Sequence, residues 1–298
     1  MQIKRLWITG FLLLLSSSSG FCLEPINSDI GFTASQGQFI FRELLSFSEA
    51  TGAGKDVDKI VSRTSIVYGL TSRQTLMLVV PVVDAELETS GPNGNEVERE
   101  AGGLGDIVLF HKFRFFTQDE FSFTQRLSLI SGIKLPTGDN TRSDKLGRLP
   151  SSVQPGSGSV DFIIGTAYSM ETQKIGVHGD LVYKINTNDN SVRMGNTLRF
   201  DAAFVYTLYP SRITHERKAR LFGVMELNGT QMEQSRGPDG KNSDSGGVLI
   251  FASPGLTYVF PRGDLQLEFS YSIPVVTDFN GNQPEPDRVL SFGLKFFH

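Results

Sequence analysis

Apolar and polar residues alternate from about residue 38 to the end of this chain, and this pattern limits the fold more than any other feature. In the clearest run every second residue is apolar: Leu265, Leu267, Phe269, Tyr271 and Ile273. The residues between them are all polar: Gln266, Glu268, Ser270 and Ser272. A period of two is typical of β-strands with one apolar face, and no long run has the period of a helix. The sequence therefore predicts an all-β protein.

The alternating runs are longer than the ~5 or 6 residues of an average globular strand. We expect twelve strands, at residues 38–48, 59–70, 74–86, 104–116, 120–135, 158–170, 175–186, 194–208, 219–232, 247–260, 264–276 and 287–298. A tilted strand crosses a bilayer with about 9–11 residues, and bacterial outer-membrane barrels have an even number of strands. The pattern predicts a single antiparallel transmembrane β-barrel of about twelve strands. A soluble β-sandwich is the alternative, because its strands also alternate.

The connections between these strands alternate in length. "TSR", "TQDE", "METQ" and "PRGD" are short, whereas four polar segments are long: residues 87–103, 136–158, 234–247 and 277–287. Outer-membrane barrels have short periplasmic turns and longer extracellular loops. The order of the connections therefore predicts that both ends of the chain lie on the periplasmic side. The loop at 136–158 is long enough to fold into the mouth of the barrel.

The first residues have the pattern of a secretory signal peptide. Lys4 and Arg5 precede an apolar stretch at residues 6–15, and small residues follow up to Cys22. We expect residues 1–22 to be removed, with the cleavage position uncertain by a residue or two, and residues 23–298 to form the barrel. Cys22 is the only cysteine, and no later stretch is apolar for long enough to form a transmembrane helix.

Charged residues occupy polar positions of the predicted strands, so a barrel places them in its lumen. The candidates for lining a solute path are Arg126, Lys134, Asp106, Asp161, Lys112, Arg114, His178, Asp180, Arg199, Glu226 and Glu268. Arg42, Arg63, Lys184 and Asp201 share their parity. Both signs are present, so the alternative role is a set of ion pairs that stabilises the wall. A barrel of about twelve strands leaves a narrow lumen, since eight strands are filled by side chains and sixteen leave an aqueous channel.

Three stretches of the sequence resemble an outer-membrane family named for the meta pathway of phenol degradation. They are "GGLGDIVLFHKFRFF" (102–116), "LSLISGIKLPTGDN" (127–140) and "PGSGSVDFIIGTAYS" (155–169). The resemblance implies a β-barrel and passage of hydrophobic or aromatic compounds. By position it carries over Gly103, Gly105, Asp106, Lys134, Pro136, Thr137, Gly138, Pro155, Gly156, Gly158, Ser159 and Asp161. No substrate-binding residues come with the resemblance.

The motif positions have a mainly structural interpretation. Pro136 and Gly138 end a strand at the outer rim, because proline cannot donate to the ladder and glycine permits a turn. We expect Lys134 to point into the lumen near this rim and to pair with Asp106, Asp161 or both.

Three functions are compatible with this sequence. The first is a passive channel or facilitator for small hydrophobic or aromatic solutes, and the second is a surface-interaction barrel with a closed lumen. The third is a hydrolase at His178, which shares a face with Asp180 and would need a serine or aspartate within hydrogen-bond reach. His111 has the same parity as Leu109 and Phe113, which predicts a lipid-facing position.

Other classes have little support. A formal charge of −4 and the period-two pattern argue against nucleic-acid binding, and no metal-binding or nucleotide-binding motif is present. We expect no cofactor, no metal and no enzymatic activity.

The expected partners are outer-membrane lipid, a small solute and the barrel-assembly machinery, which would contact the last strand. That strand ends in His298, where outer-membrane proteins usually carry an aromatic residue.

Overall fold

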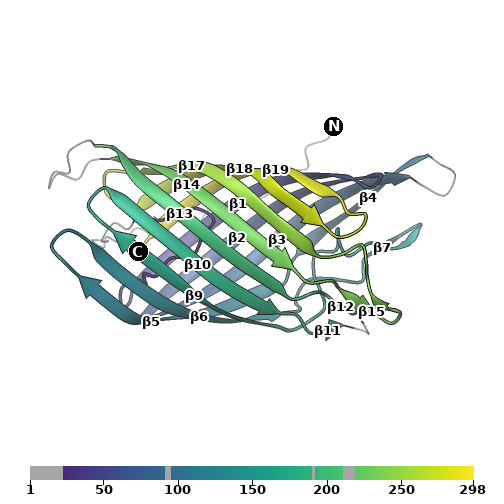
Figure 1. The fold of residues 1–298 in the computed structure, drawn as a ribbon, viewed down its shortest axis with the longest axis horizontal. Helices are drawn as coiled ribbons and strands as arrows, with labels where there is room; N and C mark the ends of the chain where they lie inside the picture. The colour runs from purple at the N-terminus through teal and green to yellow at the C-terminus, as the bar shows by residue number, and fades with distance from the viewer. Residues whose placement is uncertain (1–22, 91–94, 190–191, 211–218) are drawn as a thin grey trace.

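The computed structural model describes residues 23–298 except 91–94, 190–191 and 211–218, so the predicted signal peptide lies outside the described residues. The chain forms a closed antiparallel β-barrel with tilted strands (Figure 1). Two strands, β4 and β5, pair one after the other with β3 and form one strand that is interrupted at Gly105 and Asp106. The barrel therefore has twelve strands, which confirms the predicted fold. The described residues include no helix that could span a membrane.

The wall of the barrel consists of β1 (Phe39–Gly52), β2 (Lys55–Thr71), β3 (Gln74–Ser90), β4 (Glu96–Leu104), β5 (Ile107–Asp119), β6 (Thr124–Leu135), β9 (Asp161–Glu171), β10 (Ile175–Ile185), β13 (Thr197–Tyr209), β14 (Arg220–Met232), β17 (Gly247–Val259), β18 (Leu265–Phe279) and β19 (Glu285–Phe297). Short strands lie in the long connections: β7 (Ser143–Asp144), β8 (Gly147–Arg148), β11 (Asn188–Asp189), β12 (Val192–Arg193), β15 (Arg236–Gly237) and β16 (Gly240–Lys241). These short strands gather at one end of the barrel, which is the extracellular end (Figure 1).

The first and last strands close the barrel. β1 pairs with β19 from Ile40 opposite Phe297 to Thr51 opposite Glu285. Beyond the ladder, Phe39 and His298 exchange both backbone hydrogen bonds, at N–O distances of 2.9 and 2.8 Å. The terminal histidine thus completes the seam between the two strands, and the sheet has no free edge there.

The two faces of the wall differ as the alternation predicted. Large apolar side chains point outward and are exposed, such as Ile164 (53%), Leu227 (51%) and Phe292 (49%). Small polar side chains point inward, and Ser128, Ser169, Ser253 and Ser270 are fully buried. This arrangement suits a wall between hydrocarbon and a polar lumen.

The extracellular end differs from the prediction over residues 87–103, which we expected to be a loop. Here β3 continues to Ser90 and β4 begins at Glu96, so most of the segment is a hairpin that extends the barrel. Its strand structure is explained by the apolar positions Leu87 and Ala101, which face inward and are almost fully buried. The segment contains many glycine and acidic residues, so the alternation at these two inward positions could not be recognised in the sequence.

The connection between β6 and β9 folds into the mouth of the barrel, which the sequence had left open. Leu149 and Val153, in the middle of this connection, are 5% and 0% exposed. They pack against four inward side chains of the extended strands: Val57, Ala85, Leu87 and Ala101. Asp144 accepts a hydrogen bond of 2.7 Å from Arg99 of β4, and this contact lowers the pKa of the Asp144 carboxyl.

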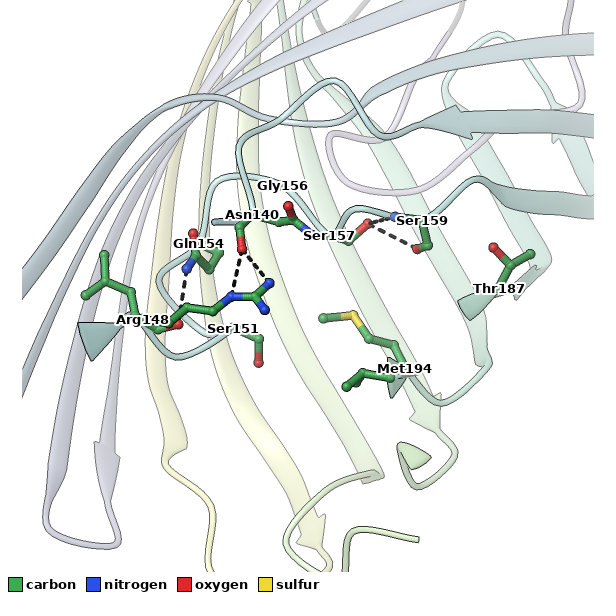
Figure 2. A pocket seen from close by; sticks show the side chains of 11 residues that line it. Asn140, Arg148, Ser151, Gln154, Gly156, Ser157, Ser159, Thr187 and Met194 are labelled. Atoms are coloured by element: carbon green, nitrogen blue, oxygen red, sulfur yellow. Dashed lines mark hydrogen bonds between the residues drawn. The ribbon is translucent and has the colours of Figure 1, made fainter. Parts of the chain in front are cut away.

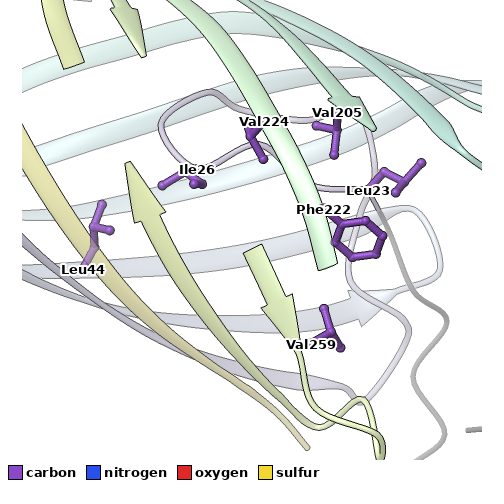
Figure 3. Packing of buried hydrophobic residues seen from close by; sticks show 7 residues of the cluster. All are labelled: Leu23, Ile26, Leu44, Val205, Phe222, Val224 and Val259. Carbon is purple, nitrogen blue, oxygen red and sulfur yellow. The ribbon is translucent and has the colours of Figure 1, made fainter. Parts of the chain in front are cut away.

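Residues 23–38, here called the lumen segment, run inside the barrel before β1 begins. Leu23 and Ile26 are buried against Val205, Phe222, Val224 and Val259 of the wall and close to Leu44 (Figure 3). Gly37 and Gln38 form backbone hydrogen bonds with Gly69 near the periplasmic turn between β2 and β3. The segment therefore occupies the periplasmic part of the lumen.

Two glycines of the family motifs meet at the extracellular rim. A Cβ atom on Gly156 would lie 2.2 Å from the carbonyl oxygen of Gly138, and one on Gly138 would lie 2.6 Å from the Cα of Gly156. This contact fixes the end of β6 against the segment that leads into β9. Only hydrogen atoms fit between the two backbones.

We predict that Gly156→Ala destabilises the barrel, because its methyl group would force the two backbones apart. Overpacking of this kind costs about 1–3 kcal/mol. The control is Gly237→Ala in the extracellular hairpin of β15 and β16, where an added Cβ meets nothing within 4 Å. Thermal unfolding in detergent, followed by the gel shift of the folded barrel, measures the difference. Equal unfolding temperatures for both variants would contradict the prediction.

Candidate functional site

The wall of the lumen holds the lumen segment at several points, and Glu226 of β14 is one of the fully buried residues that do so. The Glu226 carboxylate accepts hydrogen bonds from the backbone N–H groups of Ile26 and Asn27, at 2.9 and 3.0 Å. It also accepts one from the Ser28 hydroxyl at 2.5 Å. Glu226 is fully buried, so these donors replace the water that a carboxylate needs.

Asp29 connects the segment to the opposite charges of the wall. Its carboxylate lies 2.5 Å from Arg199 and 3.6 Å from Lys112. Arg199 also contacts Asp180 and Asp201, both at 3.1 Å, and the backbone N–H of Asp29 donates to Asp180 at 2.7 Å. Arg199 is thus one cation among three carboxylates, and one of the three belongs to the segment.

The remaining contacts hold the part of the segment before Asp29 and the part after it. Glu24 forms an ion pair with Lys295, which also lies 3.2 Å from Glu268. Arg42 joins the same group, because it binds Glu268 at 2.7 Å and donates to the carbonyl of Ile26 at 2.6 Å.

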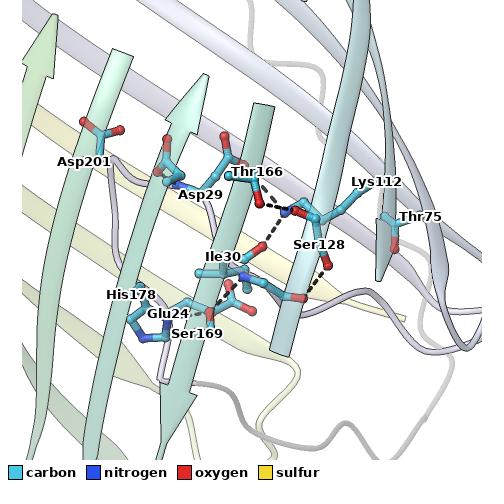
Figure 4. A network of polar contacts seen from close by, with 12 residues as sticks. Glu24, Asp29, Ile30, Thr75, Lys112, Ser128, Thr166, Ser169, His178 and Asp201 are labelled. Atoms are coloured by element: carbon cyan, nitrogen blue, oxygen red, sulfur yellow. Dashed lines mark hydrogen bonds and ion pairs between the residues drawn. The ribbon is translucent and has the colours of Figure 1, made fainter. Parts of the chain in front are cut away.

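The part of the segment after Asp29 is held by small residues and a lysine of the wall (Figure 4). Gly31 donates to Ser169 at 2.8 Å and accepts from Ser128 at 2.6 Å. Lys112 donates to the carbonyl of Ile30 at 2.8 Å. A Cβ on Gly31 would lie 2.5 Å from the carbonyl oxygen of Arg126, so the segment approaches the wall as closely as only glycine allows.

A cavity of about 400 Å³, here called the lumen cavity, lies between the lumen segment and the inner faces of β1, β2, β3, β5 and β6. Apolar side chains form much of its lining: Ile30, Phe32, Ile40, Val67, Met77, Phe110 and Ile130. Polar atoms at its margin come from Gln38, Ser65 and Thr75 and from charged side chains that hold the lumen segment. The cavity has the size and mixed lining of a small-molecule site.

A second group of charges lies at the extracellular mouth. Lys134 of β6 pairs with Asp106 at 3.0 Å and with Asp161 at 2.6 Å, so the predicted pairing involves both acids. Asp106 also accepts hydrogen bonds from the backbone N–H and the hydroxyl of Ser157, at 2.9 and 2.6 Å. The ion pairs therefore hold the connection between β6 and β9, here called the inward-folded loop, against the rim.

A pocket of about 270 Å³ lies beside this network, between the inward-folded loop and residues Thr187, Val192 and Met194 (Figure 2). Arg148 donates to the carbonyl of Asn140 at its edge, at 2.7 Å. In the described part of the chain, this pocket thus lies near the extracellular mouth and the lumen cavity lies nearer the periplasmic end.

The predicted path residues are all associated with the lumen, but few of them are free to meet a solute. Lys112, Asp180, Arg199 and Glu226 hold the lumen segment, and Glu268 reaches it through Arg42. Arg114 and Arg126 lie at the periplasmic rim: Arg114 donates to Ser72, and Arg126 pairs with Asp119 at 2.7 Å. The sequence did not predict the lumen segment. The feature of the sequence that comes closest to predicting it is the number of acidic residues at inward positions of β10, β13 and β14.

The hydrolase alternative meets its distance requirement but not its access requirement. His178 Nδ1 lies 2.8 Å from Ser169 Oγ, whereas Asp180 is bound to Arg199 and Asp29. Ser169 is 0% exposed and is covered by the Gly31 N–H group, so a substrate carbonyl has no approach to its oxygen. The described residues contain no group of three or more acidic, histidine or cysteine side chains placed to hold a metal ion.

Comparisons with known proteins agree with this architecture. A family model described as "Putative MetA-pathway of phenol degradation" matches residues 53–278. The crystal structure of the COG4313 outer membrane channel from Pseudomonas putida F1 is similar, with a TM-score of 0.66 and 16% identity over 92% of this chain and 100% of that chain. The translocator domain of the autotransporter NalP from Neisseria meningitidis gives 0.44 and 11%, over 89% of both chains. The comparison with curated proteins finds no match. The chain is a β-barrel of the bacterial outer membrane.

We predict that Lys134→Met destabilises the barrel, because two buried carboxylates would lose their shared cation. Breaking a buried ion pair on one side costs about 3–5 kcal/mol. Lys145→Met, at an exposed position of the same loop, is the control. Adding Asp161→Asn to Lys134→Met removes one of the two unpaired charges and is expected to recover part of the loss. Unfolding midpoints in detergent measure all three; an unchanged midpoint for Lys134→Met would show that the pairing has no energetic role.

Proposed function

Because the chain belongs to the family described as "Putative MetA-pathway of phenol degradation", we propose that this barrel is a channel for passive uptake of small hydrophobic or aromatic solutes. The observation that carries the proposal is the lumen cavity of about 400 Å³, with its apolar lining and polar margin. Such a lining accepts a ring on one side and a hydroxyl group on the other. The similar COG4313 protein is itself described as an outer membrane channel.

The lumen segment defines how such a channel would work. It occupies the periplasmic part of the lumen and leaves the lumen cavity beside it, so only small solutes pass without a rearrangement. Hydrogen bonds, ion pairs and the apolar packing of Leu23 and Ile26 hold it to the wall, and it is not part of the β-ladder. A modest displacement therefore widens the path without opening the barrel.

A second candidate is a surface-interaction barrel with a closed lumen. The inward-folded loop and the lumen segment favour it, since each restricts one end. The two candidates differ in whether anything crosses the membrane, so transport measurements decide between them. We also infer that the assembly machinery contacts β19, whose last residues carry the aromatic pair Phe296 and Phe297.

The first test removes residues 23–35 and measures ion conductance in planar bilayers. We expect the deletion to raise the conductance severalfold, because the segment fills part of the pore. Asp29→Asn is a milder variant that loses the ion pairs to Arg199 and Lys112 while the barrel wall is intact. It is expected to increase the frequency of openings. If neither variant conducts although the gel shift shows folded barrels, the closed surface barrel is correct.

The second test fills the lumen cavity. Met77→Trp places a large ring in the cavity from β3, and Val82→Trp places the same ring on the lipid face of the same strand, where Val82 is 48% exposed. We expect Met77→Trp to reduce phenol or toluene flux into protein-containing vesicles severalfold and Val82→Trp to leave it unchanged. An equal flux through both variants would place the solute path elsewhere.

A further inference from the structure

Two basic side chains of β2, Lys59 and Arg63, have no acidic partner in the part of the chain that the structure describes. Lys59 forms neither an ion pair nor a hydrogen bond there, and Arg63 only donates to the Ser46 hydroxyl, at 3.4 Å. The contacts that hold the lumen segment and the inward-folded loop therefore do not account for these two residues. Polar groups without a partner inside a protein call for another explanation.

The register of β2 places both cations between the mouth of the barrel and the lumen cavity. From the extracellular end, the inward residues of β2 are Val57, Lys59, Val61, Arg63, Ser65 and Val67. The first of them packs against the inward-folded loop, and the last two line the lumen cavity. A solute that moves along β2 from the mouth to the cavity therefore passes Lys59 and then Arg63.

Arg63 is open to the lumen. It is exposed, whereas the paired inward residues Lys134 and Glu268 are buried. Its guanidinium contacts Ser46, an inward residue that is 4% exposed, so the surface that Arg63 exposes faces the interior of the barrel. Lys59 is half-buried on the same face of β2. A group in the lumen thus reaches Arg63 without displacing an acidic partner.

In the described strands, no acid flanks the two cations on the inner wall. The residues opposite them in the ladders are uncharged: Leu44 and Ser48 of β1, and Pro81 and Ala85 of β3. Beside Arg63, the hydroxyls of Ser46 and Ser291 are hydrogen-bonded to each other at 3.0 Å. Hydroxyl groups also donate to anions, so the surroundings of Arg63 suit a negatively charged group.

The charges along the route from the mouth to the cavity have a positive excess. At the mouth two lysines, Lys134 and Lys184, balance two acids, Asp106 and Asp161. Four cations and three acids line the cavity: Arg42, Lys112, Arg114 and Lys295 against Glu24, Asp29 and Glu171. Lys59 and Arg63 add two positive charges between these groups. A narrow passage with an excess of one sign of charge concentrates ions of the opposite sign.

We propose that Lys59 and Arg63 form a subsite for the acidic group of a small aromatic anion, a carboxylate or a sulfonate, whose ring then enters the lumen cavity. Arginine and lysine side chains select anions in pores, and a guanidinium matches a carboxylate with two parallel hydrogen bonds. The inference rests on the proposed channel and names the charge of the solutes that it prefers. A neutral phenol uses the apolar lining alone.

Uptake into protein-containing vesicles tests this preference. The probes are benzenesulfonate, benzyltrimethylammonium and phenol, and valinomycin with potassium on both sides holds the membrane potential near zero. We expect benzenesulfonate to enter severalfold faster than benzyltrimethylammonium. If phenol shows protein-dependent flux but the two charged probes enter equally, or the cation enters faster, this inference is overturned and the channel stands. If none of the three shows protein-dependent flux, the channel and the inference are overturned together.

Substitutions in β2 identify the subsite. Arg63→Gln and Lys59→Gln are each expected to lower the uptake ratio of benzenesulfonate to benzyltrimethylammonium about threefold, the effect of one unit charge several ångströms away in water. Neither substitution leaves an acid unpaired, so both variants are expected to fold, which the gel shift checks. Arg63→Lys keeps the charge and is expected to keep most of the ratio.

The control is Arg262→Gln, which removes a cation from an exposed position in the periplasmic turn between β17 and β18. It is expected to leave the ratio unchanged. The assignment is overturned if Arg63→Gln and Lys59→Gln give the same ratio as this control. It is also overturned if Arg63→Lys loses as much of the ratio as Arg63→Gln does, because the effect then does not depend on charge.

Discussion

Pairing of every backbone group within the wall is the constraint on which this structure depends. Hydrocarbon offers no hydrogen-bond partners, so a strand in the membrane needs a neighbour on each side. The antiparallel ladder between β1 and β19 satisfies this need, and the exchange between Phe39 and His298 extends it to the last residue. Once the sheet is closed, alternation fixes which side chains face lipid and which face the lumen. The interior chemistry follows from that geometry.

A polar interior creates a second requirement, because buried charges need partners. In this barrel the partners come from two sources. At the extracellular mouth the wall satisfies itself, through Lys134 with Asp106 and Asp161. In the periplasmic part the wall does not supply all the partners that its charged side chains need. The lumen segment supplies backbone N–H groups to Glu226 and a carboxylate to Arg199. The charges that suggested a solute path are thus mainly the docking site of the chain's own N-terminal residues.

The wall could be predicted from the sequence because it depends on a local period of two. Strand number, side-chain orientation and the rim position of Lys134 follow from that period and from Pro136 and Gly138. The lumen segment could not be predicted in this way, since it has no period and its bonds join residues far apart in the chain. Likewise, Leu87 and Ala101 were hidden among acidic residues and glycines, and only their contact with Leu149 and Val153 explains the extended hairpin.

The lumen segment also determines the order in which the molecule is completed. Its anchors on β9 and β14 lie 138 to 200 residues further along the chain, so its docking site does not exist until most of the wall has formed. Contacts between such distant residues form late in folding, because the loop between them closes at an entropic cost. The lumen segment, which precedes β1 in the chain, is therefore among the last parts of the described chain to reach its final position. Until it does, the newly closed barrel is a wider pore than the finished protein.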